Sequence, residues 1–174
     1  MKYVLIFFII VFTSCSSTVE EHFILPADFK GEVRVIFEEP CGTKIEKNKE
    51  GILVYMIPEN GVLVTSNPFL FNTDKRRYFY KKQSGELMEI PLMYKVEAEK
   101  HWNSDTDSPD PEKDKIGVYM ISCGEKIDNG YSYEGATISN FHDLQDSLSS
   151  ETFQMNVFKR TYGSLKECER KSVH

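Results

Sequence analysis

Apolar and polar residues alternate along much of the chain between residues 23 and 138, which is the spacing of half-buried β-strands. The clearest example is residues 32–37, where Val33, Val35 and Phe37 fall on one face. A strand with one mostly apolar face has to cover that face with another layer. The pattern therefore predicts a strand that packs on one side.

Two β-rich runs, residues 51–57 and 62–65, are separated by Pro58-Glu59-Asn60-Gly61. Asn-Gly is a strong hairpin signal because both residues tolerate the positive φ angles of a type I′ turn. Proline has no N–H to donate, so Pro58 suits a strand end or a sheet edge. We expect the two runs to pair with each other as a hairpin.

Two further hairpins are expected later in the chain. Residues 77–82 and 86–91 are joined through a short loop that ends in Gly85, and glycine adopts a positive φ without strain. Residues 116–123 and 131–138 are joined through the turn residues Asp128-Asn129-Gly130.

Beyond residue 139 the apolar spacing changes to three and four residues, which is the period of an α-helix. Asn140 can cap a first helix, and Ser149 or Ser150 can cap a second. Residues 153–162 also alternate like a strand, but their composition and the lack of a nearby turn favour a helix. The segment from 139 to 174 is therefore expected to be helical.

The first residues of the chain have a different character. Lys2 precedes an apolar run of about ten residues, which has the length of a signal sequence and is too short to span a bilayer. The residues before Cys15 resemble the lipobox of bacterial lipoproteins, although that pattern prefers leucine where Phe12 stands. We expect Cys15 to be acylated, with palmitate or a similar chain. Ordinary secretory cleavage near Ser16 or Ser17, which gives a soluble secreted β-domain, is the alternative.

These patterns predict a mainly β fold, an antiparallel β-sandwich of about seven strands with a helical C-terminal appendage. A partly open β-barrel of the α+β type is the alternative. The expected organisation is a lipoprotein signal peptide over 1–15, a tether over 16–22, a β-sandwich domain over 23–138 and a helical segment over 139–174.

Two stretches of the chain carry a family resemblance. Residues 24–35, which begin Ile-Leu-Pro-Ala-Asp-Phe-Lys-Gly, and residues 55–65, which contain Ile-Pro-Glu-Asn-Gly, resemble the opening of an uncharacterised family of bacterial lipoproteins. The resemblance implies no activity and supplies no functional residues. It agrees with an extracytoplasmic protein anchored to a membrane, on the outer membrane or cell surface if the cell is Gram-negative.

Three cysteines remain if Cys15 is the anchor. Outside the cytoplasm one pair can form a disulfide. Three pairings of Cys41, Cys123 and Cys168 are open, and Cys41 with Cys123 is favoured because each closes an apparent strand. Three free thiols are the alternative.

The sequence carries no recognisable catalytic, cofactor or metal motif. Its four histidines have no metal-ligand spacing and no Cys-x-x-Cys occurs, so we expect no metal, no cofactor and no catalytic residue. Asp105, Asp107 and Asp110 offer oxygen ligands for Ca²⁺, but the central glycine of a calcium loop is missing. A solvated loop is favoured there.

Residues 75–82 alternate cations with aromatic rings, as on surfaces that bind anionic polymers or lipid headgroups. The alternative is an edge strand whose lysines hinder aggregation between sheets. The candidate ligand-contacting residues are Tyr78, Tyr80, Lys81, Lys82 and, from the following loop, Trp102.

The net charge of −6 argues against nucleic acid as a partner, because phosphates reward clustered Lys and Arg. The expected role is a non-enzymatic binding or assembly module of the cell envelope. It would contact membrane lipid through acylated Cys15 and an envelope protein or glycan through its folded part. An enzyme with an unrecognised carboxylate site is the alternative.

Overall fold

The computed structural model describes residues 19–70, 75–93, 115–124, 130–140, 143–144 and 151–172. The predicted signal peptide with Cys15, the aspartate loop and Trp102 lie outside the described residues. The elements are β1 (Glu20–Pro26), β2 (Gly31–Phe37), β3 (Leu53–Met56), β4 (Val62–Val64), β5 (Lys75–Lys81), β6 (Leu87–Ile90), β7 (Gly117–Gly124), β8 (Ser132–Ser139) and α4 (Glu151–Ser172).

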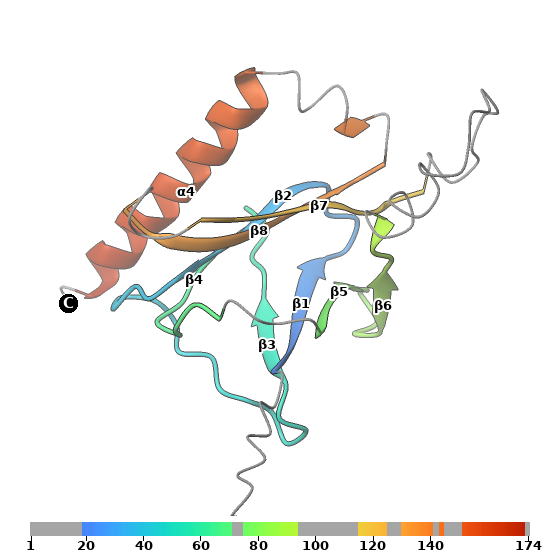
Figure 1. The fold of residues 1–174 in the computed structure, drawn as a ribbon, viewed down its shortest axis with the longest axis horizontal. Coiled ribbons are helices and arrows are strands. Elements are labelled where there is room, and N and C mark those ends of the chain that lie inside the picture. The colour runs from blue at the N-terminus through green and yellow to red at the C-terminus, as the bar shows by residue number, and fades with distance from the viewer. Residues whose placement is uncertain are drawn as a thin grey trace, which may run out of the picture.

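The described strands form two sheets of four strands each. The first sheet has the order β3-β1-β5-β6, and the second sheet has the order β4-β2-β8-β7. Figure 1 shows the second sheet between the first sheet and α4, so the molecule has a helix layer over a two-sheet sandwich. A mainly β fold with a C-terminal helix is thus confirmed.

Both sheets contain parallel pairs, although only antiparallel pairs were expected. β1 pairs in parallel with β3 and with β5, and β2 pairs in parallel with β4. The β2–β8, β5–β6 and β7–β8 pairs are antiparallel. The last two of these are the hairpins expected around Gly85 and Gly130, and both predictions are confirmed.

The first expected hairpin is wrong, because β3 lies in the first sheet and β4 in the second. A turn does form, since the Gly61 N–H donates to the Pro58 carbonyl at 2.9 Å and Gly61 has φ of 77°. It carries the chain from one sheet to the other, where each strand pairs with an earlier strand. The turn residues set the local bend but not the pairing of the strands that flank it.

The main core lies between the two sheets. The Phe23 ring of β1 stacks on Tyr55 of β3, with centroids 5.1 Å apart, and on Tyr78 of β5, with centroids 4.8 Å apart. The second sheet contributes the fully buried side chains of Val33, Val35, Phe37, Ala136 and Ile138.

The described fold begins slightly earlier than expected. β1 begins at Glu20, so the sheet starts three residues before the expected domain boundary at residue 23. α4 continues unbroken through Gly163. The helix prediction for residues 153–162 is confirmed. Asn140 accepts a hydrogen bond from the Asp143 N–H at 2.7 Å, as an N-terminal cap does.

Candidate functional site

Helix α4 buries only a narrow stripe against the second sheet. Val157 and Thr161 are its buried side chains, whereas Met155, Phe158 and Tyr162 are each about half exposed. A helix that packs on one face normally turns its apolar side chains inward. The apolar stripe of Met155, Phe158 and Tyr162 instead lines the flank of the helix.

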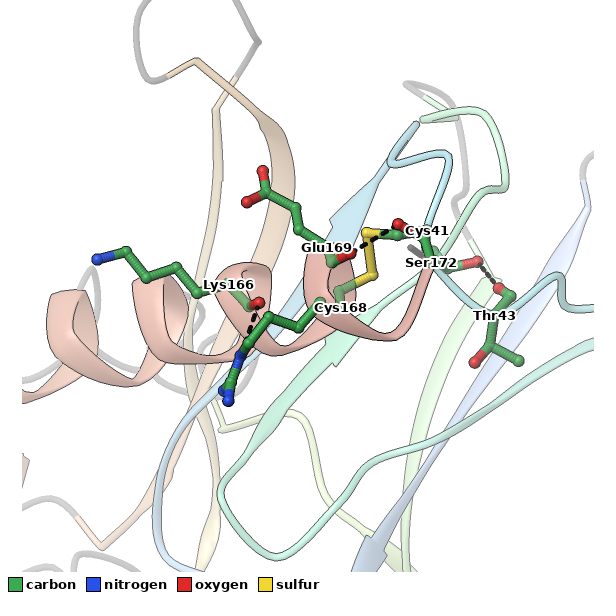
Figure 2. Close-up of a disulfide and its surroundings, with 8 residues drawn as sticks. Cys41, Thr43, Lys166, Cys168, Glu169 and Ser172 are labelled. Atoms are coloured by element: carbon green, nitrogen blue, oxygen red, sulfur yellow. Dashed lines mark hydrogen bonds between the residues drawn. A yellow bond between two sulfur atoms is a disulfide. The ribbon is translucent and has the colours of Figure 1, made fainter. Parts of the chain in front are cut away.

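Two side-chain contacts hold α4 to the turn between β3 and β4. Arg160 Nη1 donates to the Asn60 carbonyl at 2.8 Å, and Asn60 Nδ2 donates to Ser164 Oγ at 3.2 Å. A disulfide between Cys168 and Cys41, with Cα atoms 5.4 Å apart, joins the last turns of the helix to the loop after β2. Figure 2 shows this bond beside Thr43 and the C-terminal turns of α4.

The expected pairing of Cys41 with Cys123 is therefore wrong. Cys123 is an exposed free thiol on β7, at one edge of the second sheet. Cys41 precedes Thr43, which bridges to Thr65 just after β4 at the other edge. The two sulfurs thus lie at opposite edges, and α4 brings Cys168 to Cys41.

A groove of 790 Å³ runs between α4 and the second sheet, and we call it the aromatic groove. The Phe158 and Tyr162 rings of α4 have centroids 4.7 Å apart on one wall. The Tyr131 and Tyr133 rings, 5.9 Å apart, lie on the other. The full lining is Arg34, Tyr131, Tyr133, Glu151, Gln154, Met155, Val157, Phe158 and Tyr162.

Arg34 in this groove is held in position by its neighbours. Its guanidinium carbon lies 4.3 Å from the centre of the Tyr133 ring, and its Nε donates to Glu32 Oε1 at 3.1 Å. Its Nη1 lies 3.4 Å from the Tyr131 hydroxyl. A planar cation fixed on an aromatic face loses little side-chain freedom when a partner binds.

A second groove of 620 Å³ lies along another flank of α4, and we call it the basic groove. Three cationic side chains line it with one acidic side chain, Asp143. The lining residues are Lys30, Gly31, Thr137, Ser139, Asp143, Phe153, Asn156, Lys159 and Arg160.

A buried ionic cluster joins the two sheets. Arg76 Nε lies 2.7 Å from Glu134 Oε1 and 3.6 Å from Glu21 Oε2, and the Tyr55 hydroxyl donates to Glu21 Oε1 at 3.0 Å. Burial raises the pKa of Glu134 to about 7, with Glu21 adding to the rise, although Arg76 favours the ionised form. These two carboxylates do come from different sheets, as a carboxylate enzyme would require. They are buried in the core and line neither groove, so the cluster is suited to joining the sheets.

The cations and aromatic rings of residues 75–82 do not share one exposed face. β5 is an interior strand between β1 and β6, so it is not the protected edge either. Tyr78 and Tyr80 are buried, and the Tyr80 hydroxyl donates to the Phe29 carbonyl at 2.7 Å. Lys81 and Lys82 are exposed at the strand end, and Lys82 pairs with Glu86 at 3.1 Å. Tyr78 and Tyr80 point inward together with Arg76 of the buried ionic cluster, whereas Lys75, Arg77 and Lys81 are exposed.

The aromatic groove could not be predicted from the apolar pattern of α4. The helical period puts Phe158 and Tyr162 near the same helix face as Val157, so it predicts that all three pack inward. The signal that could have separated them is the width of the apolar arc, which is too broad for one narrow contact with a sheet. Tyr131 and Tyr133 alternate along β8, but no pattern shows that a helix stands over them.

Two kinds of feature are absent from the described part of the chain. No helix there is both long and apolar enough to cross a membrane. Among the same residues, no three His, Cys, Asp or Glu side chains are grouped so that they could hold a metal ion.

Residues 17–127 match the model of a family of unknown function, DUF6843. The chain belongs to this family. The matched residues include β1 through β7, whereas β8 and α4 lie beyond them. The sequence resemblance predicted a family that has no assigned activity, and membership in this family of unknown function agrees with that prediction. The aromatic and basic grooves of this DUF6843 chain therefore combine matched residues, such as Arg34 and Lys30, with residues outside the match.

A comparison with curated proteins found no match. Among solved structures, a crystal structure of a "Putative Lipoprotein from Bacillus anthracis" is 15% identical, and the alignment covers 70% of this chain and 69% of that chain with a TM-score of 0.42. A likeness of this size carries no argument about this chain.

Proposed function

We propose that this protein is a membrane-anchored extracytoplasmic lipoprotein whose folded domain acts as a non-enzymatic binding module of the cell envelope. The observation that carries the binding role is the aromatic groove, where exposed Met155, Phe158 and Tyr162 face Tyr133 and the fixed Arg34. Aromatic residues, Met and Arg are the types enriched at protein interfaces. An envelope protein is therefore the partner that this groove favours.

The anchor in this proposal is Cys15. The support for it is the charged and apolar sequence that precedes the cysteine. Disulfides persist mainly in oxidising compartments outside the cytoplasm, so the Cys41–Cys168 bond supports the same location. Two or more acyl chains on Cys15 would hold the protein to the membrane stably.

Metabolic labelling with a fatty acid tests the anchor. We expect the label on the wild-type chain and none on Cys15→Ala. The variant should also be missing from the processed, membrane-bound form of the protein. Cys123→Ser is the matched control, because it removes an exposed thiol outside the signal region. A wild-type chain that carries no label would leave a secreted β-domain without a lipid anchor.

Photo-crosslinking in native membranes tests the groove. A photoreactive residue at Phe158 should capture a discrete protein, and Tyr162→Ala should reduce that product several-fold. The control carries the photoreactive residue at Met88, an exposed apolar position on β6 of the first sheet. The same products from both positions would contradict a partner specific to the groove. A product that contains glycan and no protein would replace the protein partner with a glycan.

A further inference from the structure

The floor of the basic groove carries two hydroxyl-bearing residues that are largely buried. Thr137 and Ser139 of β8 are only 4% and 6% exposed, and both line the groove. Ala136 and Ile138, which alternate with them, point into the core between the sheets, so the two hydroxyls point toward α4.

Neither hydroxyl has a hydrogen-bond partner among the described residues, and neither oxygen is among the fully buried side-chain atoms that lack a partner, so both are open to the groove. Buried polar side chains are nearly always hydrogen-bonded, to the protein or to a molecule that occupies the space beside them. Thr137 and Ser139, which open into one groove from the same strand face, therefore offer adjacent donors to an occupant with several acceptor atoms.

The cations around this floor indicate that the occupant is negatively charged. Lys30, Lys159 and Arg160 line the groove against one acidic side chain, Asp143, which pairs with Lys30 at 3.4 Å. Lys159 has no carboxylate at ion-pair distance in the described part of the chain. The whole chain has a net charge of −6, so this positive groove is a local exception to an acidic surface.

One end of the groove exposes the main chain. Gly31 lines it with φ of 115°, and the position that a Cβ would take has no atom within 4 Å. A small ligand group can therefore approach the backbone at the start of β2.

We propose that the basic groove binds a phosphate group of a ligand. Thr137 and Ser139 donate hydrogen bonds to its oxygens, and Lys159, Lys30 and Arg160 neutralise its charge. Phosphate oxygens accept several strong hydrogen bonds at once, and charge-assisted bonds from Lys and Arg are the stronger kind. This site lies on a different flank of α4 from the aromatic groove, and it depends on neither the anchor nor the partner proposed above.

Titration calorimetry on the full chain in uncharged detergent micelles tests the site. The probes are inorganic phosphate and glycerophosphoglycerol, a soluble phosphodiester headgroup, at an ionic strength held constant with chloride. Stronger binding of phosphate would identify a free phosphate or phosphomonoester as the ligand. Stronger binding of the diester would identify a lipid headgroup or a phosphodiester polymer.

Three variants and a control separate a built site from general charge attraction. Thr137→Val and Ser139→Ala keep the net charge, and Lys159→Gln removes one cation from the groove. Lys166→Gln removes one cation from another flank of α4 and is the control. We expect at least fivefold weaker binding in the three groove variants and wild-type affinity in Lys166→Gln. Thermal unfolding identifies any variant that fails to fold. If Thr137→Val fails to fold, the affinities of Ser139→Ala and Lys159→Gln decide whether the site is built from these residues.

Two results would overturn the proposal. One is the absence of binding of both probes to the wild-type chain. The other is equal weakening in Lys159→Gln and Lys166→Gln with no effect of either hydroxyl variant, which would show charge attraction only.

Discussion

At the scale of single residues, position in the sandwich decides what a side chain can do. Glu134 and Glu21 share one cation, Arg76, between the sheets, so the cluster holds more negative than positive charge when both are ionised. A proton on Glu134 leaves Arg76 balanced by Glu21. Burial of Glu134, together with the nearby charge of Glu21, raises the pKa of its carboxyl.

The raised pKa makes stability depend on pH. Because the folded-state pKa of Glu134 is about 7 against an ordinary 4.5, its stabilising proton is fully effective below about 4.5 and is lost as the pH rises through 7. The loss is on the order of 2–3 kcal/mol. We expect the melting temperature to fall between pH 5 and pH 8, and Glu134→Gln to flatten this dependence. An equal slope in Glu134→Gln and in the exposed control Glu86→Gln would contradict the assignment.

Two glycines should respond in opposite directions to alanine. Gly61 has φ of 77°, and a Cβ there would lie 2.8 Å from Phe29 Cζ and 2.9 Å from the Glu32 carbonyl oxygen. Gly61→Ala should therefore lower the free energy of unfolding by about 2 kcal/mol or more. Gly163 lies within α4 with open space around it, so Gly163→Ala should raise that free energy by about 0.5–1 kcal/mol. Denaturant unfolding measures both, and destabilisation by both would contradict this reading of Gly163.

At the scale of elements, the position of α4 depends on contacts with residues that are far away in the sequence. The disulfide spans 127 residues, and hydrogen bonds of Arg160 and Ser164 reach the turn at Asn60. These contacts hold the helix in place while its apolar flank stays open to solvent. The grooves on both flanks exist only because the helix is fixed there.

Loss of the disulfide should therefore weaken the fold. Closing so long a loop restricts the unfolded chain strongly, so Cys168→Ser should lower the free energy of unfolding by about 2–5 kcal/mol. Hydrogen exchange should show faster opening of the last turns of α4. Cys123→Ser, which removes the exposed free thiol, should leave both measurements unchanged. If reduction of the wild-type chain has no effect on its stability, the bond does not form in solution.

At the scale of the whole molecule, the order of the layers determines which face of an anchored protein points away from the membrane. The first sheet contains β1, which begins at Glu20, and α4 lies on the far side of the second sheet (Figure 1). Cys15 precedes Glu20 by five residues, and five extended steps reach at most about 18 Å. If Cys15 is lipidated, the start of β1 therefore lies close to the bilayer and α4 faces away from it.

Quenching by brominated lipid tests this orientation. Lys49 lies in the loop before β3, whose Leu53 pairs with Glu21 near the start of β1, whereas Lys166 lies on α4. A fluorophore on Lys49→Cys should be quenched several-fold more strongly than one on Lys166→Cys, each in a Cys123→Ser background. Equal quenching at the two positions would mean that the domain tumbles freely on its tether or lies on its side.

The sequence by itself determined the local structure of this protein. The apolar alternation around Val35, the loop glycine Gly85 and the helical period after residue 150 act between near neighbours, so β2, the β5–β6 hairpin and α4 could be predicted. Only the tertiary structure decided that β3 and β4 join different sheets, that Cys41 meets Cys168, and that Tyr78 turns inward while Phe158 stays outside. The physical reason is that these outcomes depend on which surfaces pack together when they are far apart in the sequence. A local pattern contains no information about such long-range packing.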